Sequence, residues 1–166
     1  MRLVAVDGPS GSGKSTYAAR LVRRLRAEGL GAAVVPTDHF ATWTDPVSWW
    51  PRLVADVLEP LRHGRAARYQ RVDWSGGLPH PGEWVDVPVP DVLVVEGVSA
   101  ARRSIAPRLD EAVWVEVPDP AERLRRAVAR DGEPSRAHLL RWQAFERGWF
   151  AVDGTKSRAD RVIIVD

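Results

Sequence analysis

The stretch VDGPSGSGKST, residues 6–16, combines glycines, hydroxyl side chains and a lysine in a pattern that binds phosphate. Gly8, Gly13, Lys14 and Ser15 match the spacing of glycine, four residues, glycine, lysine and serine, between an apolar run and a helical pattern. The glycines let backbone N–H groups converge on phosphate oxygens at a helix N-terminus, where the helix dipole favours anions. Lys14 would reach the β and γ phosphates of a nucleotide, and the Ser15 hydroxyl would hold Mg²⁺. The expected nucleotide-binding residues are Gly8, Pro9, Ser10, Gly11, Ser12, Gly13, Lys14, Ser15 and Thr16.

Two carboxylates follow other apolar runs of the chain. Asp38 comes after residues 32–36, where it would accept the proton of an attacking hydroxyl group or else act as a turn or cap residue. Glu96 closes the apolar run that begins at residue 91, and a carboxylate there is costly without a cation or donors. It would stand next to Mg²⁺ or its water shell, or else accept a local backbone N–H. If the reaction is transfer of a phosphoryl group, a phosphate that accepts it is already anionic and needs arginines rather than a base. Asp38 therefore favours a hydroxyl group as the acceptor.

Apolar runs and helical spacing place these residues in an alternating α/β chain. Five buried strands are expected, at residues 2–6, 32–36, 91–97, 112–117 and 161–166. The expected helices are Lys14 to Glu28, with Gly29 behind it, a helix capped by Ser48 that ends at Pro60 and Gly64, Asp119 to Arg130, and Ser135 to Gly148. In residues 65–91 the apolar residues follow no sustained helix or strand periodicity. We interpret this segment as a long functional loop that contains room for short strands.

Strands that alternate with helices indicate a parallel sheet with right-handed crossovers. Ligands of such sheets bind beyond the carboxyl ends of the strands. Residues 7–15, Asp38, Glu96 and the loop after Val117 should therefore lie along one rim, although they are far apart in the sequence.

The composition limits the class of protein. With 166 residues, 45% of them hydrophobic, the chain can bury one core, so we expect a single domain over residues 1–166. The absence of cysteine excludes disulfides and thiolate metal sites, and the four histidines have no ligand-like spacing. No apolar run approaches the roughly 20 residues of a membrane span, and the N-terminus has no signal pattern. We expect a cytoplasmic protein without a membrane partner.

The charge indicates the kind of ligand. A formal net charge of +2 argues against a dedicated nucleic-acid-binding surface. Of the 24 basic residues, 22 are arginine, whose planar group suits phosphate, although biased codon usage would give the same excess. We expect small ligands, namely a nucleotide and a small-molecule acceptor, bound by a monomer or a homodimer.

The chain resembles the uridine kinase and phosphoribulokinase group of P-loop kinases along nearly its whole length. The shared features are the loop GPSGSGKS, TDHF after the second strand, VLVVEG in the third, the arginine-rich RLRRAVARD and the terminal ADRVIIV. The resemblance implies a three-layer P-loop NTPase fold with a five-stranded parallel sheet. It also implies ATP and Mg²⁺ as cofactors and an alcohol group as the phosphoryl acceptor.

The same resemblance assigns roles to individual residues. It implies a base at Asp38, Mg²⁺ ligands at Ser15 and Glu96, and phosphate-covering lid arginines at Arg126 and Arg130. The lid would span about residues 121–136, and Lys14, Asp38 and Arg130 would form the catalytic set. A solvated helix face is the alternative for the arginines, because the four in this segment cannot all point one way.

The acceptor site is expected within about residues 40–91. This segment holds five of the eight tryptophans, which would stack on a planar base, line an apolar pocket or simply pack: Trp43, Trp49, Trp50, Trp74 and Trp84. In YQRVDW, Val72 stands where uridine kinases have a tyrosine, and Gly77 falls where they tend to have a base-contacting histidine. We expect Asp73 to bind an acceptor hydroxyl and Trp74 or a neighbouring tryptophan to pack on the planar or apolar part of the acceptor, without uridine specificity.

Three functions are compatible with the sequence. The favoured one is transfer of the γ-phosphoryl group of ATP to a hydroxyl of a nucleoside-like metabolite. Because VDGPSGSGKST is also similar to bacterial cytidylate kinases, a nucleoside monophosphate kinase is an alternative, against which Asp38 argues. A non-catalytic module that binds nucleotide but phosphorylates nothing would retain the same loop.

Overall fold

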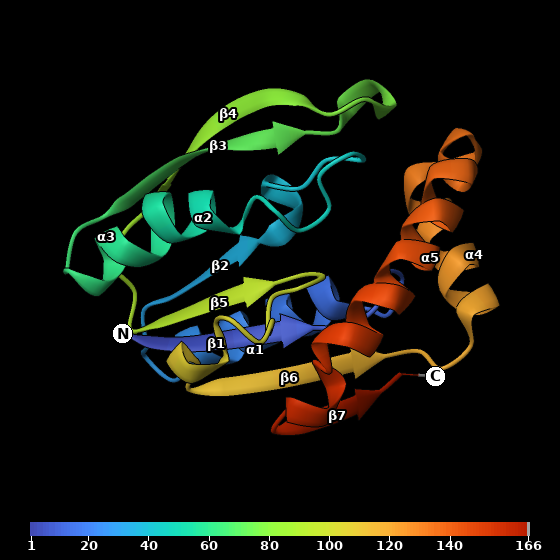
Figure 1. Ribbon diagram of the computed structural model, residues 1–166. Helices are drawn as coiled ribbons and strands as arrows, with labels where there is room; N and C mark the ends of the chain where they lie inside the picture. The colour runs from blue at the N-terminus through green and yellow to red at the C-terminus, as the bar shows by residue number, and fades with distance from the viewer. Residues whose placement is uncertain (166) are drawn as a thin grey trace.

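A five-stranded parallel sheet forms the centre of the computed structural model, which describes residues 1–165. The strand order is β2-β5-β1-β6-β7, with the bounds Ala32–Pro36, Val92–Glu96, Arg2–Asp7, Glu111–Glu116 and Arg161–Ile164. Every neighbouring pair is parallel, so all carboxyl ends lie at one edge, on the side where α4 (Pro120–Asp131) and α5 (Arg136–Asp153) stand in Figure 1. The expected α/β architecture is confirmed.

The central strands bury alternate residues on opposite faces of the sheet. One face carries Leu3, Ala5, Leu93 and Val95, and the other carries Val4, Val6, Val92 and Val94. Helix α1 (Lys14–Ala27) covers the second face with Ala18, Val22 and Leu25. A helical segment over residues 50–62 covers the first, which completes three layers.

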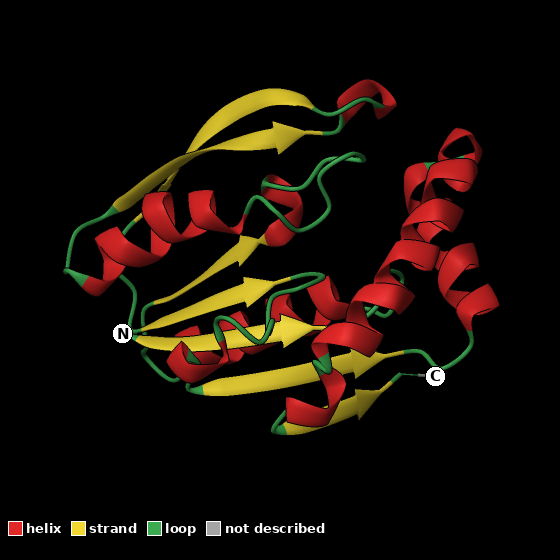
Figure 2. Cartoon of the chain, viewed as in Figure 1, coloured by secondary structure: helices red, strands yellow, loops and turns green. Residues whose placement is uncertain are grey.

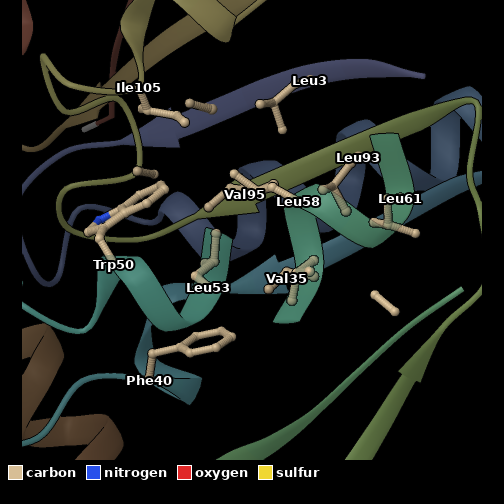
Figure 3. Packing of buried hydrophobic residues seen from close by; sticks show 14 of the residues in the cluster. Leu3, Val35, Phe40, Trp50, Leu53, Leu58, Leu61, Leu93, Val95 and Ile105 are labelled. Carbon is tan, nitrogen blue, oxygen red and sulfur yellow. The ribbon is translucent and has the colours of Figure 1, made fainter. Parts of the chain in front are cut away.

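The helical segment over residues 50–62 is not regular. It comprises α2 (Trp50–Leu53), a π-helical turn (Val54–Leu58) and α3 (Glu59–Arg62). Figure 3 shows Leu53, Leu58 and Leu61 of this segment directed toward the strand residues Leu93 and Val95. This packing, rather than a capping residue, fixes the segment on the sheet.

Two expectations about this segment were wrong. Ser48 does not cap it, because the helix begins only at Trp50, after Trp49, and no side chain makes a capping hydrogen bond. Pro60 does not end it either. Pro60 lies in the first turn of α3, directly after the π-helical turn, and the helix continues to Arg62, shortly before Gly64.

Two longer helices follow β6. In α4 (Pro120–Asp131) the Asp119 side chain accepts a hydrogen bond from the N–H of Ala121 at 2.9 Å, so the expected cap and start are confirmed. Helix α5 (Arg136–Asp153) runs past Gly148, where its end was expected. A glycine inside a helix costs only about 1 kcal/mol, and the ring of Phe150 packs edge-on against Trp114 of β6 at 4.7 Å. That contact holds the last turns in place.

An antiparallel hairpin occupies the segment that had no sustained period. It consists of β3 (Ala67–Asp73) and β4 (His80–Val87), joined through a 3₁₀ turn at Ser75–Gly77. Ala67, Tyr69 and Val87 are buried in the same cluster as the helical segment. Figure 2 shows the hairpin outside that segment, with its turn on the side of α5. Within residues 1–165, no helix has both the length and the apolar character needed to cross a membrane.

Candidate active site

The loop between β1 and α1 lies close to β6 because of a glycine. Gly8 has φ of +142°, and a Cβ atom there would lie 2.0 Å from the carbonyl oxygen of Val115, so only glycine fits. The preceding Asp7 is fully buried. Its carboxylate accepts hydrogen bonds from the N–H groups of Gly8, Ser99 and Ala101 at 2.7, 3.1 and 2.8 Å. Asp7 thus ties the start of residues 8–15, here called the phosphate-binding loop after the sequence motif, to the loop after β5.

The N-terminus of α1 directs backbone donors toward this loop. Gly13 precedes the helix with φ of +87°, and no side chain caps it. The first N–H groups of a helix have no intrahelical acceptor, and the dipole favours an anion beside them. Ser12 adds a buried hydroxyl that has no hydrogen-bond partner among residues 1–165. These unsatisfied donors fit the phosphate chain of a nucleotide.

Lys14 lies among three buried carboxylates. Its side chain is 8% exposed, and Nζ donates a hydrogen bond to the carbonyl oxygen of Pro9 at 3.0 Å. Burial raises the pKa of Asp7 to about 7 and also raises the pKa values of Glu96 and Glu146. The positive charge of Lys14 opposes each of these shifts. The ammonium group therefore lies inside the loop, hydrogen-bonded to Pro9 and near enough to three carboxyl groups to favour their ionised forms, not on a mobile surface side chain.

Ser15 and Glu96 bring two oxygen ligands together. The Ser15 hydroxyl donates to Oε1 of Glu96 at 3.3 Å, and Glu96 is 7% exposed. Among the described residues, no group of three or more His, Cys, Asp and Glu side chains could cage a metal. Mg²⁺ does not require such a cage, because it usually keeps several waters and takes other ligands from substrate phosphates. One hydroxyl and one carboxylate beside the phosphate-binding loop fit that ion.

Asp38 stands in a 3₁₀ turn, Thr37–His39, directly after β2. Gly97 lets β5 end close to this turn, since a Cβ atom there would lie 1.9 Å from Oγ1 of Thr37 and φ is +136°. The indole N–H of Trp74 donates to the backbone oxygen of Asp38 at 3.0 Å. The backbone of Asp38 is thereby fixed while its carboxylate stays exposed.

A cavity of about 490 Å³ opens where these segments meet. The phosphate-binding loop, the segment after β2, the hairpin turn and α4–α5 contribute its lining, which comprises Ser10, Asp38, Trp43, Trp74, Gly77, Arg130, Asp131, Ser135, Leu139 and Trp142. Of the residues predicted from the sequence, the cavity brings together Ser10, Asp38, Trp74 and Arg130.

The two expected lid arginines differ in position. Arg130 lines the cavity and forms a bidentate pair with Asp131, at 2.6 Å from Nε to Oδ1 and 2.7 Å from Nη2 to Oδ2. These hydrogen bonds are the main reason why the pKa of Arg130 is raised, and the negative charge of Asp38 raises it further. Arg126 does not line the cavity; its Nε donates to Oε1 of Glu122 at 2.7 Å. The structure brings Arg130, and not Arg126, to Asp38.

The expected acceptor residues also differ. Trp74 lines the cavity, whereas Asp73 does not. The carboxylate of Asp73 accepts a hydrogen bond from the N–H of Ser75 at 2.8 Å, which is the main cause of its lowered pKa, and lies 3.8 Å from Nη2 of Arg71. Asp73 therefore stabilises the hairpin turn in this structure.

The tryptophans divide between core and cavity. Trp49 and Trp50 are buried in the main hydrophobic cluster, and Trp84 is 56% exposed on β4. Trp43 from the expected acceptor segment lines the cavity, as does Trp142 from α5, which the sequence did not single out.

Glu146 is the buried site residue that sequence reasoning missed. It is 1% exposed, and its carboxylate accepts hydrogen bonds from the N–H of Ser10 at 3.0 and 3.1 Å and from the Ser10 hydroxyl at 2.9 Å. Leu139, Trp142 and Glu146 recur at helical spacing and share one face of α5. An acidic residue at the helical spacing of apolar residues was the sequence feature that could have indicated a buried, hydrogen-bonded carboxylate.

No protein-family model matches the sequence, and no curated protein matches it. Solved structures do match in fold. A possible uridine kinase from Bacillus stearothermophilus aligns with a TM-score of 0.69 and 20% identity, over 98% of this chain and 88% of the other. A candidate fructose transport system kinase from Silicibacter aligns with a TM-score of 0.69 and 25% identity, over 97% and 88%. Phosphoribulokinase from Rhodobacter spheroides aligns with a TM-score of 0.60 and 16% identity, over 99% and 71%.

The chain therefore has the fold of the P-loop kinases. The resemblance to the uridine kinase and phosphoribulokinase group, expected from the motifs, is confirmed in the arrangement of the whole chain.

Proposed function

We propose that the protein is a kinase that transfers the γ-phosphoryl group of ATP, with Mg²⁺, to a hydroxyl of a small, nucleoside-like molecule. The position of Asp38 carries this proposal, because this carboxylate lines one cavity with Ser10 of the phosphate-binding loop and Arg130 of α4. A carboxylate opposite phosphate-binding groups can accept the proton of an attacking hydroxyl. The kinase fold of the structural neighbours supports the same reaction class.

In this reaction some residues would position the phosphate chain and Mg²⁺, and one residue would accept the proton. Backbone N–H groups at the start of α1 and the ammonium of Lys14 would hold the phosphate chain, and Arg130 would stabilise the transferring group. Ser15 and Glu96 would hold Mg²⁺, which neutralises phosphate charge when bound. Asp38 would accept the proton while the acceptor oxygen bonds to the γ-phosphorus and the bond to the β–γ bridging oxygen breaks. ADP leaves with that oxygen.

Two alternative functions differ from this proposal in the phosphoryl acceptor or in the absence of phosphoryl transfer. A nucleoside monophosphate kinase would use a nucleotide as acceptor, and a non-catalytic module would bind ATP without acceptor-dependent turnover. The neighbours are named as kinases of several different acceptors, so their names do not choose among acceptors.

A screen for acceptor-dependent ADP release tests the proposal. The purified chain is incubated with ATP, Mg²⁺ and nucleosides, vitamins, sugars or nucleoside monophosphates, and mass spectrometry identifies the phosphorylated product. We expect release that depends on an acceptor hydroxyl and yields a phosphate ester. Release with nucleoside monophosphates alone, or ATP binding without turnover by any acceptor, would support one of the alternatives instead.

A further inference from the structure

One wall of the cavity is aromatic. Trp43, Trp74 and Trp142, here called the aromatic wall, come from the segment after β2, the hairpin and α5. The ring of Trp43 meets that of Trp74 edge-on at 4.8 Å and that of Trp142 edge-on at 5.9 Å. Leu139 extends the apolar surface beside them. Three segments distant in the sequence therefore contribute one apolar surface.

The aromatic wall offers mainly ring surface to a ligand. The indole N–H of Trp74 donates to the backbone oxygen of Asp38 at 3.0 Å, and that of Trp43 donates to the backbone oxygen of Gly77 at 3.4 Å. His138 stacks on Trp43 with a centroid distance of 4.8 Å, which fixes that ring further. Since both donors are already used, these two rings can select a ligand by stacking and shape but not by its heteroatoms.

The polar part of the lining is negatively charged. Asp38 and Asp131 supply two carboxylates, and Arg130 is the one cationic side chain among the described lining residues. Nε and one terminal nitrogen of Arg130, Nη2, already donate hydrogen bonds to Asp131. If Arg130 turned toward the phosphates of ATP, the two carboxylates would remain on the acceptor side. A phosphate or carboxylate on the acceptor would therefore meet repulsion.

From the aromatic wall and this charge we infer the acceptor class: an alcohol carried on a planar aromatic body that bears no anionic group. The ring would lie against Trp43, Trp74 and Trp142, with its hydroxyl directed to Asp38. The inference rests on the proposed kinase function for the transfer step, but the binding preference follows from the lining alone.

Four small probes separate the contributions of ring and charge. Para-(hydroxymethyl)benzamide and para-(hydroxymethyl)benzoate have nearly the same shape and differ in charge, while cyclohexylmethanol lacks the aromatic ring and glycerol lacks an apolar body. Binding of each is measured by calorimetry with Mg²⁺ and a non-hydrolysable ATP analogue, and ADP release is measured with ATP. We expect the benzamide to bind with a Kd of about 10 mM or tighter and about tenfold better than the other three.

Substitutions test whether these preferences arise at the inferred site. Trp142→Ala should weaken benzamide binding about tenfold and leave the affinity for the ATP analogue unchanged. Trp84→Ala is the matched control, because its indole is exposed on β4 and does not line this cavity. Asp131→Asn should improve binding of the benzoate relative to the benzamide, since it removes one of the two carboxylates.

The two measurements distinguish the inference from the proposed function. Preferential binding of the benzamide without any ADP release would uphold the binding preference and count against kinase function. ADP release with glycerol or with an anionic acceptor, together with equal or weaker binding of the benzamide, would uphold kinase function and overturn the inference. The inference would also be overturned if no aromatic probe bound, or if Trp142→Ala and Trp84→Ala behaved alike.

Discussion

Glu146 of α5 holds Ser10 of the phosphate-binding loop by both its backbone N–H and its hydroxyl, the latter at 2.9 Å. Glu146 is 1% exposed, whereas Ser10 is half-buried and lines the cavity, so these hydrogen bonds are partly shielded from water. The same face of α5 supplies Leu139 and Trp142 to the lining of the cavity. One rigid helix thus fixes the loop between β1 and α1 relative to the aromatic wall.

Replacement of Glu146 should weaken both the fold and nucleotide binding. In Glu146→Ala the half-buried N–H of Ser10 loses its acceptor, so we expect the free energy of unfolding to fall by about 1–3 kcal/mol and the KM for ATP to rise. Glu146→Gln keeps an acceptor oxygen and should recover most of the loss. Urea unfolding and steady-state kinetics measure both effects. Glu83→Ala, on the exposed face of β4, is the control. If Glu146→Ala and Glu146→Gln lost equal amounts of stability and ATP affinity, the charge of Glu146 would matter more than its hydrogen bonds.

Lys14→Ala should remove phosphoryl transfer while the chain still folds. Loss of the ammonium group deprives the developing phosphate charge of its buried partner, and we expect kcat/KM to fall by about 10²–10³-fold or more. The other lysine of the chain, Lys156, pairs with Glu116 at the surface, so Lys156→Ala is a matched control. Cooperative thermal unfolding and ADP release are measured on both variants. Full activity in Lys14→Ala would contradict the assigned role.

Asp38→Asn should lower kcat by about 10²–10⁴-fold with little change in ATP affinity, because asparagine keeps the shape but cannot accept the proton. Acceptor-dependent ADP release and calorimetric titration with ATP give the two quantities. Asp86→Asn, on the exposed face of the hairpin, controls for loss of a charge elsewhere. If ATP binding collapsed in Asp38→Asn, the residue would be a metal ligand or a structural residue rather than the base.

Features determined by short stretches of sequence could be predicted. The five strands, the phosphate-binding loop and the Asp119 cap each depend on neighbours in the chain, and the parallel topology then places Asp38 and Glu96 on one rim. The end of α5 could not be predicted from the neighbouring sequence. Gly148 has a low helix propensity, but the packing of Phe150 on Trp114 outweighs it.

Features that depend on distant segments escaped prediction. Glu146 lies in register with apolar residues of α5, but its partner, Ser10, is known only once the helix docks on the loop between β1 and α1. The aromatic wall joins Trp142 to residues of the hairpin and of the segment after β2, and no spacing in the sequence relates them. Asp73, whose motif predicts a contact with the acceptor, accepts a hydrogen bond from the N–H of Ser75 and does not line the cavity, so its contact with the acceptor stays a prediction.

The buried carboxyl group of Asp7 should make stability depend on pH. Its ordinary pKa is 3.8, and burial raises the folded-state pKa to about 7. Between these values the folded chain binds more protons than the unfolded chain, so the contribution of Asp7 to the free energy of unfolding is full below about pH 4 and lost as the pH rises through about 7. Glu96 and Glu146, whose pKa values are also raised by burial, act in the same direction above their ordinary value of 4.5. Glu122, whose pKa is lowered to about 2 by Arg125 and Arg126, acts oppositely but only below 4.5.

Asp7→Asn isolates this contribution. Asparagine cannot titrate, so its free energy of unfolding should fall less than that of the unmodified protein between about pH 5 and about pH 8, by up to about 1.4 kcal/mol per pH unit where Asp7 titrates. The variant should also be less stable at about pH 5 by about 1–3 kcal/mol, because one amide group cannot accept all three N–H hydrogen bonds that Asp7 receives. Urea unfolding at several pH values measures both quantities, with Asp86→Asn expected to run parallel to the unmodified protein. Parallel curves for Asp7→Asn and the unmodified protein would mean that Asp7 stays ionised in the folded chain, held by its three N–H donors and by Lys14.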